Sequence, residues 1–139
     1  MTLHELLASQ RAFQEIVIRY KYQWSIDTLT AAQKNAIFND TVLGLVSETT
    51  EFLDEANWKM HQCDRDFVYE RQLEEVVDII KYALNLLVYL GVTDGEFAKM
   101  FYGKTVRNYE KFMLNFPRAV NDANVQAAYT SAMNHDAQS

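Results

Sequence analysis

Two pairs of acidic residues, each separated by three positions, are the strongest chemical signal in this sequence. Glu48 and Glu51 stand in the stretch SETTEFLDE. Glu75 and Asp78 stand in LEEVVDII. Residues three apart on a helix point in similar directions, so each pair can present two carboxylates to the same space. Both pairs lie among apolar residues, where uncompensated charge is costly, and the pattern therefore predicts a cation between them.

Carboxylate ligands without histidine or cysteine indicate a hard cation. Four converging carboxylates suit one or two Mg²⁺ ions, with Mn²⁺ as a substitute, and Mg²⁺ takes its remaining ligands from water and substrate phosphates. Glu55 and Glu74 are further candidates, either as ligands or as the base that activates water. The alternative is a solvated acidic surface, because acids three apart are common on exposed helix faces.

A stripe of basic and amide side chains is predicted further along the chain. It consists of Lys104, Arg107, Asn108 and Lys111. Such a stripe can hold phosphate, because lysine supplies a mobile point charge and arginine a planar pair of donors. Lys59 and Lys81 are additional candidates. The alternative is a solvated stripe that pairs with Glu110 and other nearby acids.

Several side chains could stack on a nucleobase or form hydrogen bonds with it. They are Gln10, Phe13, Gln14, Trp24, Trp58, Tyr82 and Asn85. Aromatic residues at helical spacing are more often part of a core, so core packing is the alternative for each aromatic member.

The composition indicates one globular domain. The chain has 139 residues, of which 49% are hydrophobic, which is enough for a core and short for two domains. Its net charge of −6 has the wrong sign for attraction to nucleic acid or an anionic membrane, so we expect neither as a partner. The single cysteine cannot form an internal disulfide, and the longest apolar stretch, residues 83–91, is about half the length of a membrane-spanning helix. We therefore expect a cytoplasmic protein.

Hydrophobic spacing and helix boundary signals predict an all-α fold with four helices, at residues 2–22, 30–60, 67–90 and 93–116. Capping boxes are expected at Thr30 and Thr93, and Gly91 is placed to end a helix. Residues 117–139 are small and polar, so we expect a partly ordered tail or a short helix that contacts a partner subunit. The predicted organisation is a domain of residues 1–116 followed by this segment.

These residues together resemble the MazG-like all-α nucleoside triphosphate pyrophosphohydrolases, a superfamily that includes the dimeric dUTPases. Its metal motif, Glu-x-x-Glu followed by Glu-x-x-Asp, is matched by ETTE at 48–51 and EVVD at 75–78. Asn85 follows the motif aspartate by seven positions, as in the MazG segment. The run KTVRNYEKF resembles a Lys-x-x-x-Asn-x-x-Arg motif of the dimeric dUTPases, with Lys111 where arginine is usual. The start LHELLASQRAFQE is similar to the dUTPase branch, in which a glutamine near this point helps to read the base, and the resemblance covers about residues 3–112.

The resemblance implies an enzyme that hydrolyses the α–β phosphoanhydride of a nucleoside triphosphate, giving the monophosphate and pyrophosphate with Mg²⁺ as cofactor. It implies that the four paired acids bind the metal, with Glu48 or Glu51 also accepting a proton from the attacking water. The basic stripe would hold the departing phosphates, and Asn108 or Asn85 would orient the sugar or a phosphate. Gln14 would contribute to binding the base.

The resemblance also implies a homodimer or homotetramer that acts on a deoxynucleotide, with dUTP or dGTP foremost, in control of the nucleotide pool. Two alternatives stay open. The chain could be a non-catalytic helical interaction module whose acids are surface charges. It could also be a phosphoribosyl-ATP pyrophosphohydrolase, which would share the metal site but take a different substrate.

Overall fold

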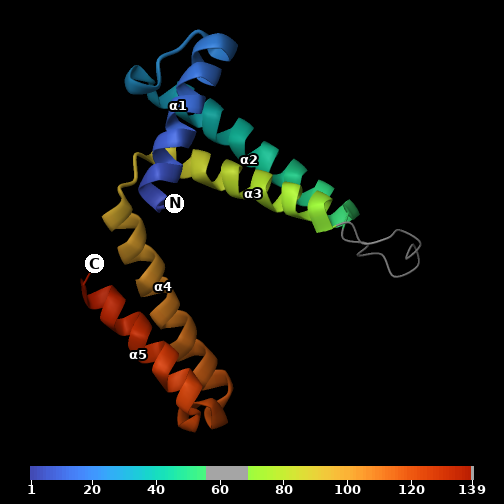
Figure 1. The fold of residues 1–139 in the computed structure, drawn as a ribbon. Coiled ribbons are helices and arrows are strands. Elements are labelled where there is room, and N and C mark those ends of the chain that lie inside the picture. The colour runs from blue at the N-terminus through green and yellow to red at the C-terminus, as the bar shows by residue number, and fades with distance from the viewer. Residues whose placement is uncertain (56–68, 139) are drawn as a thin grey trace. The chain divides into compact units, whose positions relative to one another are not determined.

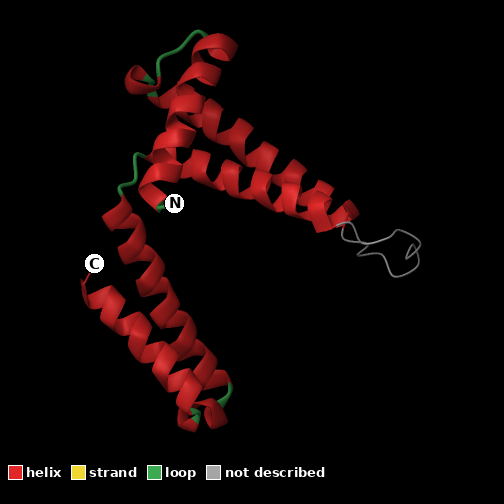
Figure 2. Ribbon diagram, in the orientation of Figure 1, coloured by secondary structure: helices red, strands yellow, loops and turns green. Residues whose placement is uncertain are grey.

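The computed structural model describes residues 1–55 and 69–138, and its elements are helical (Figure 1). They are α1 (Leu3–Tyr22), the 3-10 turn η1 (Ile26–Thr28), α2 (Ala31–Glu55), α3 (Tyr69–Leu90), α4 (Asp94–Asn115), the 3-10 segment η3 (Pro117–Asn121) and α5 (Ala123–Gln138). Throughout the described ranges the chain forms helices and connecting segments without a strand (Figure 2). The predicted all-α fold class is confirmed.

The helix boundaries follow the local signals in the sequence. Capping boxes, in which a threonine and an acid or amide three positions later bond each other's backbone amides, are formed by Thr2 with Glu5, Thr30 with Gln33, and Thr93 with Glu96. Gly91 has φ of 69°, the left-handed conformation that glycine adopts without strain after a helix end. Pro117 follows the end of α4, because proline cannot continue the backbone hydrogen bonds of a helix.

The contacts divide the chain into two compact units, Met1–Gly91 and Val92–Ser139, and each is described by itself. In the first unit, α2 and α3 run antiparallel side by side, and α1 packs on α3 (Figure 1). The small apolar core of this unit draws on all three helices, through Ile18, Ile37, Leu84 and Val88. The antiparallel pairing brings the second half of α2 next to the first half of α3, which carry the two acidic motifs.

In the second unit, α4 and α5 run antiparallel, joined through η3 (Figure 1). Ala132 is buried, and the ring of Tyr129 meets that of Tyr109 edge-on at 6.3 Å between centroids. The segment after Pro117, for which a tail or a short helix was expected, is therefore a helix that packs on α4. Its contact with a partner subunit and a domain boundary at residue 116 stay predictions.

Among the described helices, none taken singly has both the length and the apolar character needed to cross a membrane. The consecutive pair α3 and α4 reaches that standard only when counted together, by length and composition alone.

Candidate active site

Three of the four predicted metal-binding carboxylates lie together. Glu48 and Glu51 come from α2 and Glu75 comes from α3, and one carboxylate oxygen of each lies within 4.8 Å of the others. Glu48 and Glu75 are half-buried, while Glu51 is exposed. The three-residue spacing puts the first two on one face of α2, and the antiparallel neighbour supplies the third. Carboxylate oxygens are the ligands that a hard divalent cation prefers, so the residue types present fit Mg²⁺ or Mn²⁺.

Asp78, the fourth predicted ligand, lies beside this cluster but is paired with a cation of the chain. Its Oδ1 is 3.5 Å from Nζ of Lys81, one turn further along α3. Asp78 is still close enough to Glu48 and Glu75 for its negative charge to raise their pKa values. The role of all four residues as metal ligands stays a prediction.

The electrostatics of the cluster favour a cation. Desolvation raises the pKa of Glu48 above its ordinary value of 4.5, and the negative charges of Glu51 and Asp78 raise it further. The pKa of Glu75 is raised by the same causes, desolvation first and then Glu51 and Glu48. A divalent ion among these oxygens would reverse the repulsion and keep every carboxylate ionised.

The two further acidic candidates have other surroundings. Oε2 of Glu55 is 3.9 Å from Nη1 of Arg71, and its backbone carbonyl accepts a hydrogen bond from Gln72 Nε2 at 3.2 Å. Glu74 lines a shallow groove along α3 together with Val77. Neither belongs to the group of oxygens within 4.8 Å.

A cavity of about 620 Å³ lies between α1, α2 and α3, and Glu48 and Asp78 form part of its wall. Tyr82, Asn85 and Tyr89 continue this wall along α3. With a helical rise of 1.5 Å per residue, the wall from Asp78 to Tyr89 is roughly 16 Å long. The cavity therefore extends from the acidic cluster over a distance that can hold a nucleoside triphosphate.

Buried amides line the cavity away from the acids. Gln10, Gln14 and Asn85 are 8%, 6% and 7% exposed. Nε2 of Gln10 donates to Oδ1 of Asn85 at 2.7 Å, and the hydroxyl of Tyr89 donates to Oε1 of Gln14. The structure thus brings the predicted residues Gln14 and Asn85 to one cavity. The sequence feature that indicates a shared amide surface is the four-residue spacing of Gln10 and Gln14, which puts both amides on one face of α1.

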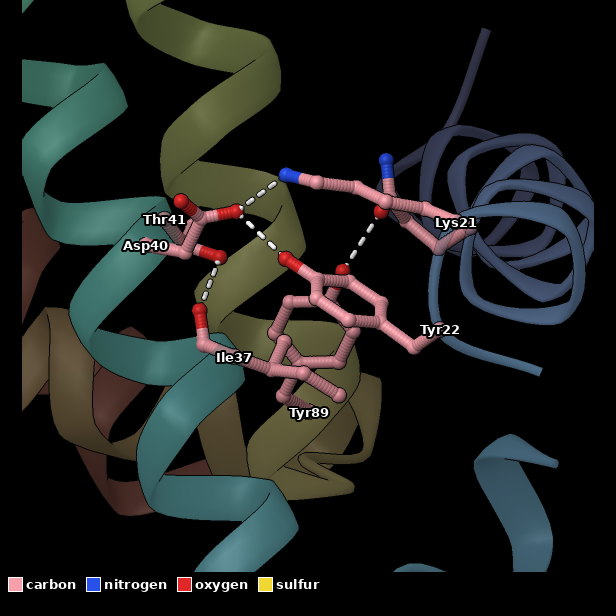
Figure 3. Close-up of polar contacts among 7 residues, drawn as sticks. Lys21, Tyr22, Ile37, Asp40, Thr41 and Tyr89 are labelled. Atoms are coloured by element: carbon pink, nitrogen blue, oxygen red, sulfur yellow. Dashed lines mark hydrogen bonds and ion pairs between the residues drawn. The ribbon is translucent and has the colours of Figure 1, made fainter. Parts of the chain in front are cut away.

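An ion pair at the rim of the cavity was not predicted. Oδ2 of Asp40 on α2 accepts hydrogen bonds from Nζ of Lys21 and from the hydroxyl of Tyr22, each at 2.6 Å (Figure 3). These hydrogen bonds, that of Lys21 first, lower the pKa of Asp40. The hydrogen bond to Asp40 in turn raises the pKa of Lys21. The contact joins the end of α1 to α2. The sequence did not indicate it, because the residues that form it are 18 and 19 positions apart.

One close contact in the cavity wall requires a glycine in α2. The ring of Tyr82 lies directly against Gly44, where a Cβ atom would overlap the ring. Both residues line the cavity between the acids and the amides. Glycine is therefore required at this position by the close approach of an aromatic ring.

The predicted phosphate-binding residues of α4 are exposed on the second unit. They are Lys104, Arg107, Asn108 and Lys111. Nη1 of Arg107 lies near Gly103, whose other close neighbour is Asp136 of α5. Their predicted role in phosphate binding stays a prediction. Lys59 and Trp58 lie outside the described residues.

Comparison with known proteins identifies the family. The family model described as dUTPase matches residues 2–137, nearly the whole chain. Searches of curated proteins and of solved structures gave no match. The paired acidic motif, the all-α fold and this match agree. The chain belongs to the all-α, MazG-like dimeric dUTPase family and is a nucleoside triphosphate pyrophosphatase, which hydrolyses a phosphoanhydride bond.

Proposed function

We propose that this chain is a Mg²⁺-dependent dUTP pyrophosphohydrolase, which converts dUTP and water to dUMP and pyrophosphate. The observation that carries the proposal is the arrangement of one cavity. Its acidic side contains Glu48, a member of a cluster of three carboxylates, and its other side contains buried amides. A nucleotide needs both kinds of surface, a cation site for its phosphates and directional hydrogen bonds for its base.

The metal would be held by Glu48, Glu51 and Glu75. Asp78 would complete the set when the charge of the ion displaces Lys81, whose ammonium group it now pairs with at 3.5 Å. A metal ion held there would supply positive charge to the phosphate oxygens and would make a nearby water more acidic. Mn²⁺ would substitute, because it prefers the same oxygen ligands.

In the reaction, a water oxygen attacks the α-phosphorus and the bond from that phosphorus to the bridging oxygen of the β-phosphate breaks. The proton of the water passes to a carboxylate, Glu48 or Glu51, and the electron pair of the broken bond leaves with pyrophosphate. Half-buried Glu48 is the better acceptor, because it lines the cavity that would hold the substrate, whereas Glu51 is exposed. Lys81, freed from Asp78, lines the same cavity and can follow the departing phosphates.

The stripe on α4 would hold the remaining phosphate charge. Its lysines and Arg107 are exposed, and Asn108 would add an amide donor. Lys59 is a further candidate. These groups would give a chain of net charge −6 the positive charge that a triphosphate requires beyond the metal.

A homodimer or homotetramer would cover apolar side chains that the single chain leaves exposed. On α2 and α3 they include Val42, Leu43, Val46, Leu53, Leu73, Val77 and Ile80. A stable assembly removes such surface from water, which is the main favourable contribution to subunit association. Light scattering coupled to gel filtration would measure the mass, and a monomer of 16.2 kDa at micromolar concentration would contradict this part of the proposal.

The decisive experiment is pyrophosphate release from a panel of triphosphates with Mg²⁺, with Mn²⁺ and with a chelator. We expect dUTP to be hydrolysed fastest, dGTP to be the next substrate to consider, and the chelator to abolish activity. Phosphoribosyl-ATP in the panel tests the related histidine-pathway chemistry. Glu48→Gln should reduce kcat by at least 100-fold, whereas Glu70→Gln, an equal charge change at an exposed position of α3, should not. Absence of dUTP hydrolysis with either metal would refute the proposal.

A further inference from the structure

We propose that Tyr89 is a positioning residue that fixes the amide of Gln14, so that the cavity accepts a pyrimidine with a 4-keto group and rejects one with a 4-amino group. The inference rests on the proposed function, because it adds the reason for the choice of base. It depends on four side chains, Gln10 and Gln14 of α1 and Asn85 and Tyr89 of α3, and on the direction of two hydrogen bonds.

The first hydrogen bond fixes Gln14. The hydroxyl of Tyr89 donates to Oε1 of Gln14, so Oε1 is occupied and Nε2 remains as a donor. Among the described residues Nε2 has no hydrogen-bond partner. No fully buried side-chain nitrogen or oxygen of the described residues lacks a partner, so Nε2 must be partly accessible. Gln14 is 6% exposed and lines the cavity, so the N–H groups of its amide reach the accessible space there.

The second hydrogen bond fixes Asn85 in the same way. Nε2 of Gln10 donates to Oδ1 of Asn85 at 2.7 Å, in a buried contact. This leaves Nδ2 of Asn85 as a donor and Oε1 of Gln10 as an acceptor, and both residues line the cavity. Asn85 contacts Gln10, and Gln10 lies one helical turn from Gln14. We infer that the three amides present a donor from Asn85, an acceptor from Gln10 and a donor from Gln14 to the base.

This order complements uracil and conflicts with cytosine. The edge of uracil has two carbonyl oxygens on either side of an N–H group, which is acceptor, donor, acceptor. Cytosine replaces one carbonyl by an amino group and the N–H by an unprotonated nitrogen. A bound cytosine would place its unprotonated nitrogen against the acceptor oxygen of Gln10 and its amino group against an amide donor. Unpaired buried polar groups are strongly unfavourable.

The selection fails if the amide of Gln14 rotates, because rotation exchanges Oε1 and Nε2 and would accept an amino group. Tyr89 opposes this rotation. Its ring meets that of Phe38 edge-on, with 6.1 Å between centroids, which limits movement of the ring. Burial raises the pKa of Tyr89 to about 12, so its hydroxyl keeps its proton near neutral pH. Figure 3 shows Tyr89 among the neighbouring polar contacts at this end of the cavity.

The test compares Tyr89→Phe with the matched control Tyr22→Phe. The control also removes a phenolic hydroxyl of the cavity wall, but that hydroxyl bonds Asp40 instead of an amide. Two quantities are measured for each protein. The first is kcat/KM for dUTP and dCTP, and the second is the dissociation constant of the α,β-imido analogue of each. We expect the preference for uracil to fall roughly tenfold in Tyr89→Phe, the effect of one hydrogen bond, and to be unchanged in Tyr22→Phe. An unchanged preference in Tyr89→Phe, or an equal loss in the control, would overturn the inference.

A second variant keeps the test decisive if Tyr89→Phe does not fold. Gln14→Glu has nearly the same shape but replaces the N–H groups that face the cavity with an acceptor oxygen. We expect its preference to shift from uracil toward cytosine, and a retained uracil preference would refute the inference. The binding measurements separate the two proposals. A wild-type protein that binds the dUTP analogue selectively but hydrolyses nothing contradicts only the proposed function, whereas equal binding of both analogues contradicts the role of Tyr89.

Discussion

Replacing Glu75 with glutamine should remove most of the stabilisation that Mg²⁺ gives the protein without weakening the metal-free fold. Glu75 supplies the only α3 oxygen in the group of three within 4.8 Å, so the site loses its bridge between α2 and α3. The pKa of Glu75 is raised by desolvation and by its acidic neighbours, which means that its charge is disfavoured in the metal-free state. The amide of glutamine removes this repulsion and keeps the size of the side chain.

The expected magnitude follows from the geometry and from ligand linkage. Oxygens on opposite sides of Mg²⁺ are about 4.2 Å apart, since each lies about 2.1 Å from the ion. At most one pair of the three oxygens can lie on opposite sides of the ion, and adjacent oxygens around it are about 3.0 Å apart. Separations of up to 4.8 Å therefore have to shorten by as much as about 1.8 Å, which rotation of the glutamate side chains can supply. An ion present at 100 times its dissociation constant adds about 2.7 kcal/mol to the stability of the folded state. For a chain of this size that corresponds to a rise of about 10 °C in the melting temperature.

Differential scanning calorimetry with Mg²⁺ and with a chelator measures both effects. The wild-type protein should show a metal-dependent shift of about 10 °C, and Glu75→Gln a shift below about 3 °C. Without metal, the variant should melt at or slightly above the wild-type temperature. Glu70→Gln, which changes the same charge on the same helix outside the cluster, should keep the full shift. A Glu75→Gln protein that keeps the full shift would refute the metal site, and so would a control that loses it.

Three further predictions concern the surroundings of the site. In a chelator, the raised pKa values of Glu48 and Glu75 contribute stability below pH 4.5 that is lost as the pH rises through them, so the wild type should lose more stability than Glu48→Gln above pH 4.5 in thermal melts. Gly44→Ala should lower the free energy of unfolding in urea by about 1–3 kcal/mol, because the new methyl group overlaps the ring of Tyr82. In a Tyr82→Ala background most of this cost of Gly44→Ala should disappear, and an equal cost there would contradict the steric reason. Asp40→Asn should cost below about 1 kcal/mol, since its ion pair is half exposed; because its pKa is lowered, the difference from wild type should disappear as the pH falls, and a difference that persists in acid would contradict the ion pair as its cause.

The helices could be predicted because their boundaries depend on neighbouring residues. The capping box at Thr93 and the left-handed Gly91 need only a few adjacent positions, and both are confirmed. The last helix was predicted only as one of two alternatives, because α5 is rich in small and polar residues and has little hydrophobic periodicity. Its packing on α4 includes Tyr129, whose hydroxyl donates to Glu110 at 3.1 Å, and such a contact across 19 residues cannot be read from local pattern.

The candidate site shows the same division between local and distant information. The carboxylates of Glu48 and Glu51 share a helix face by their spacing, and the antiparallel connection brings Glu75 to them. The pairing of Asp78 with Lys81 also has a local signal, a separation of three residues, but sequence alone could not show that the lysine turns to this acid. The hydrogen bond of Tyr89 joins residues 75 positions apart, so it depends on how α1 packs against α3.

The pairing of charges along the cavity explains why metal and nucleotide should bind together. The two lysines in the described wall, Lys21 and Lys81, are already held by Asp40 and Asp78. A triphosphate that enters without metal therefore meets the repulsive acids and no uncommitted ammonium group of this wall. A cation at the acids would neutralise them and release Lys81 toward the phosphates. Coupling between two ligands is reciprocal, so nucleotide must tighten the binding of Mg²⁺ by the same factor by which Mg²⁺ tightens the binding of nucleotide.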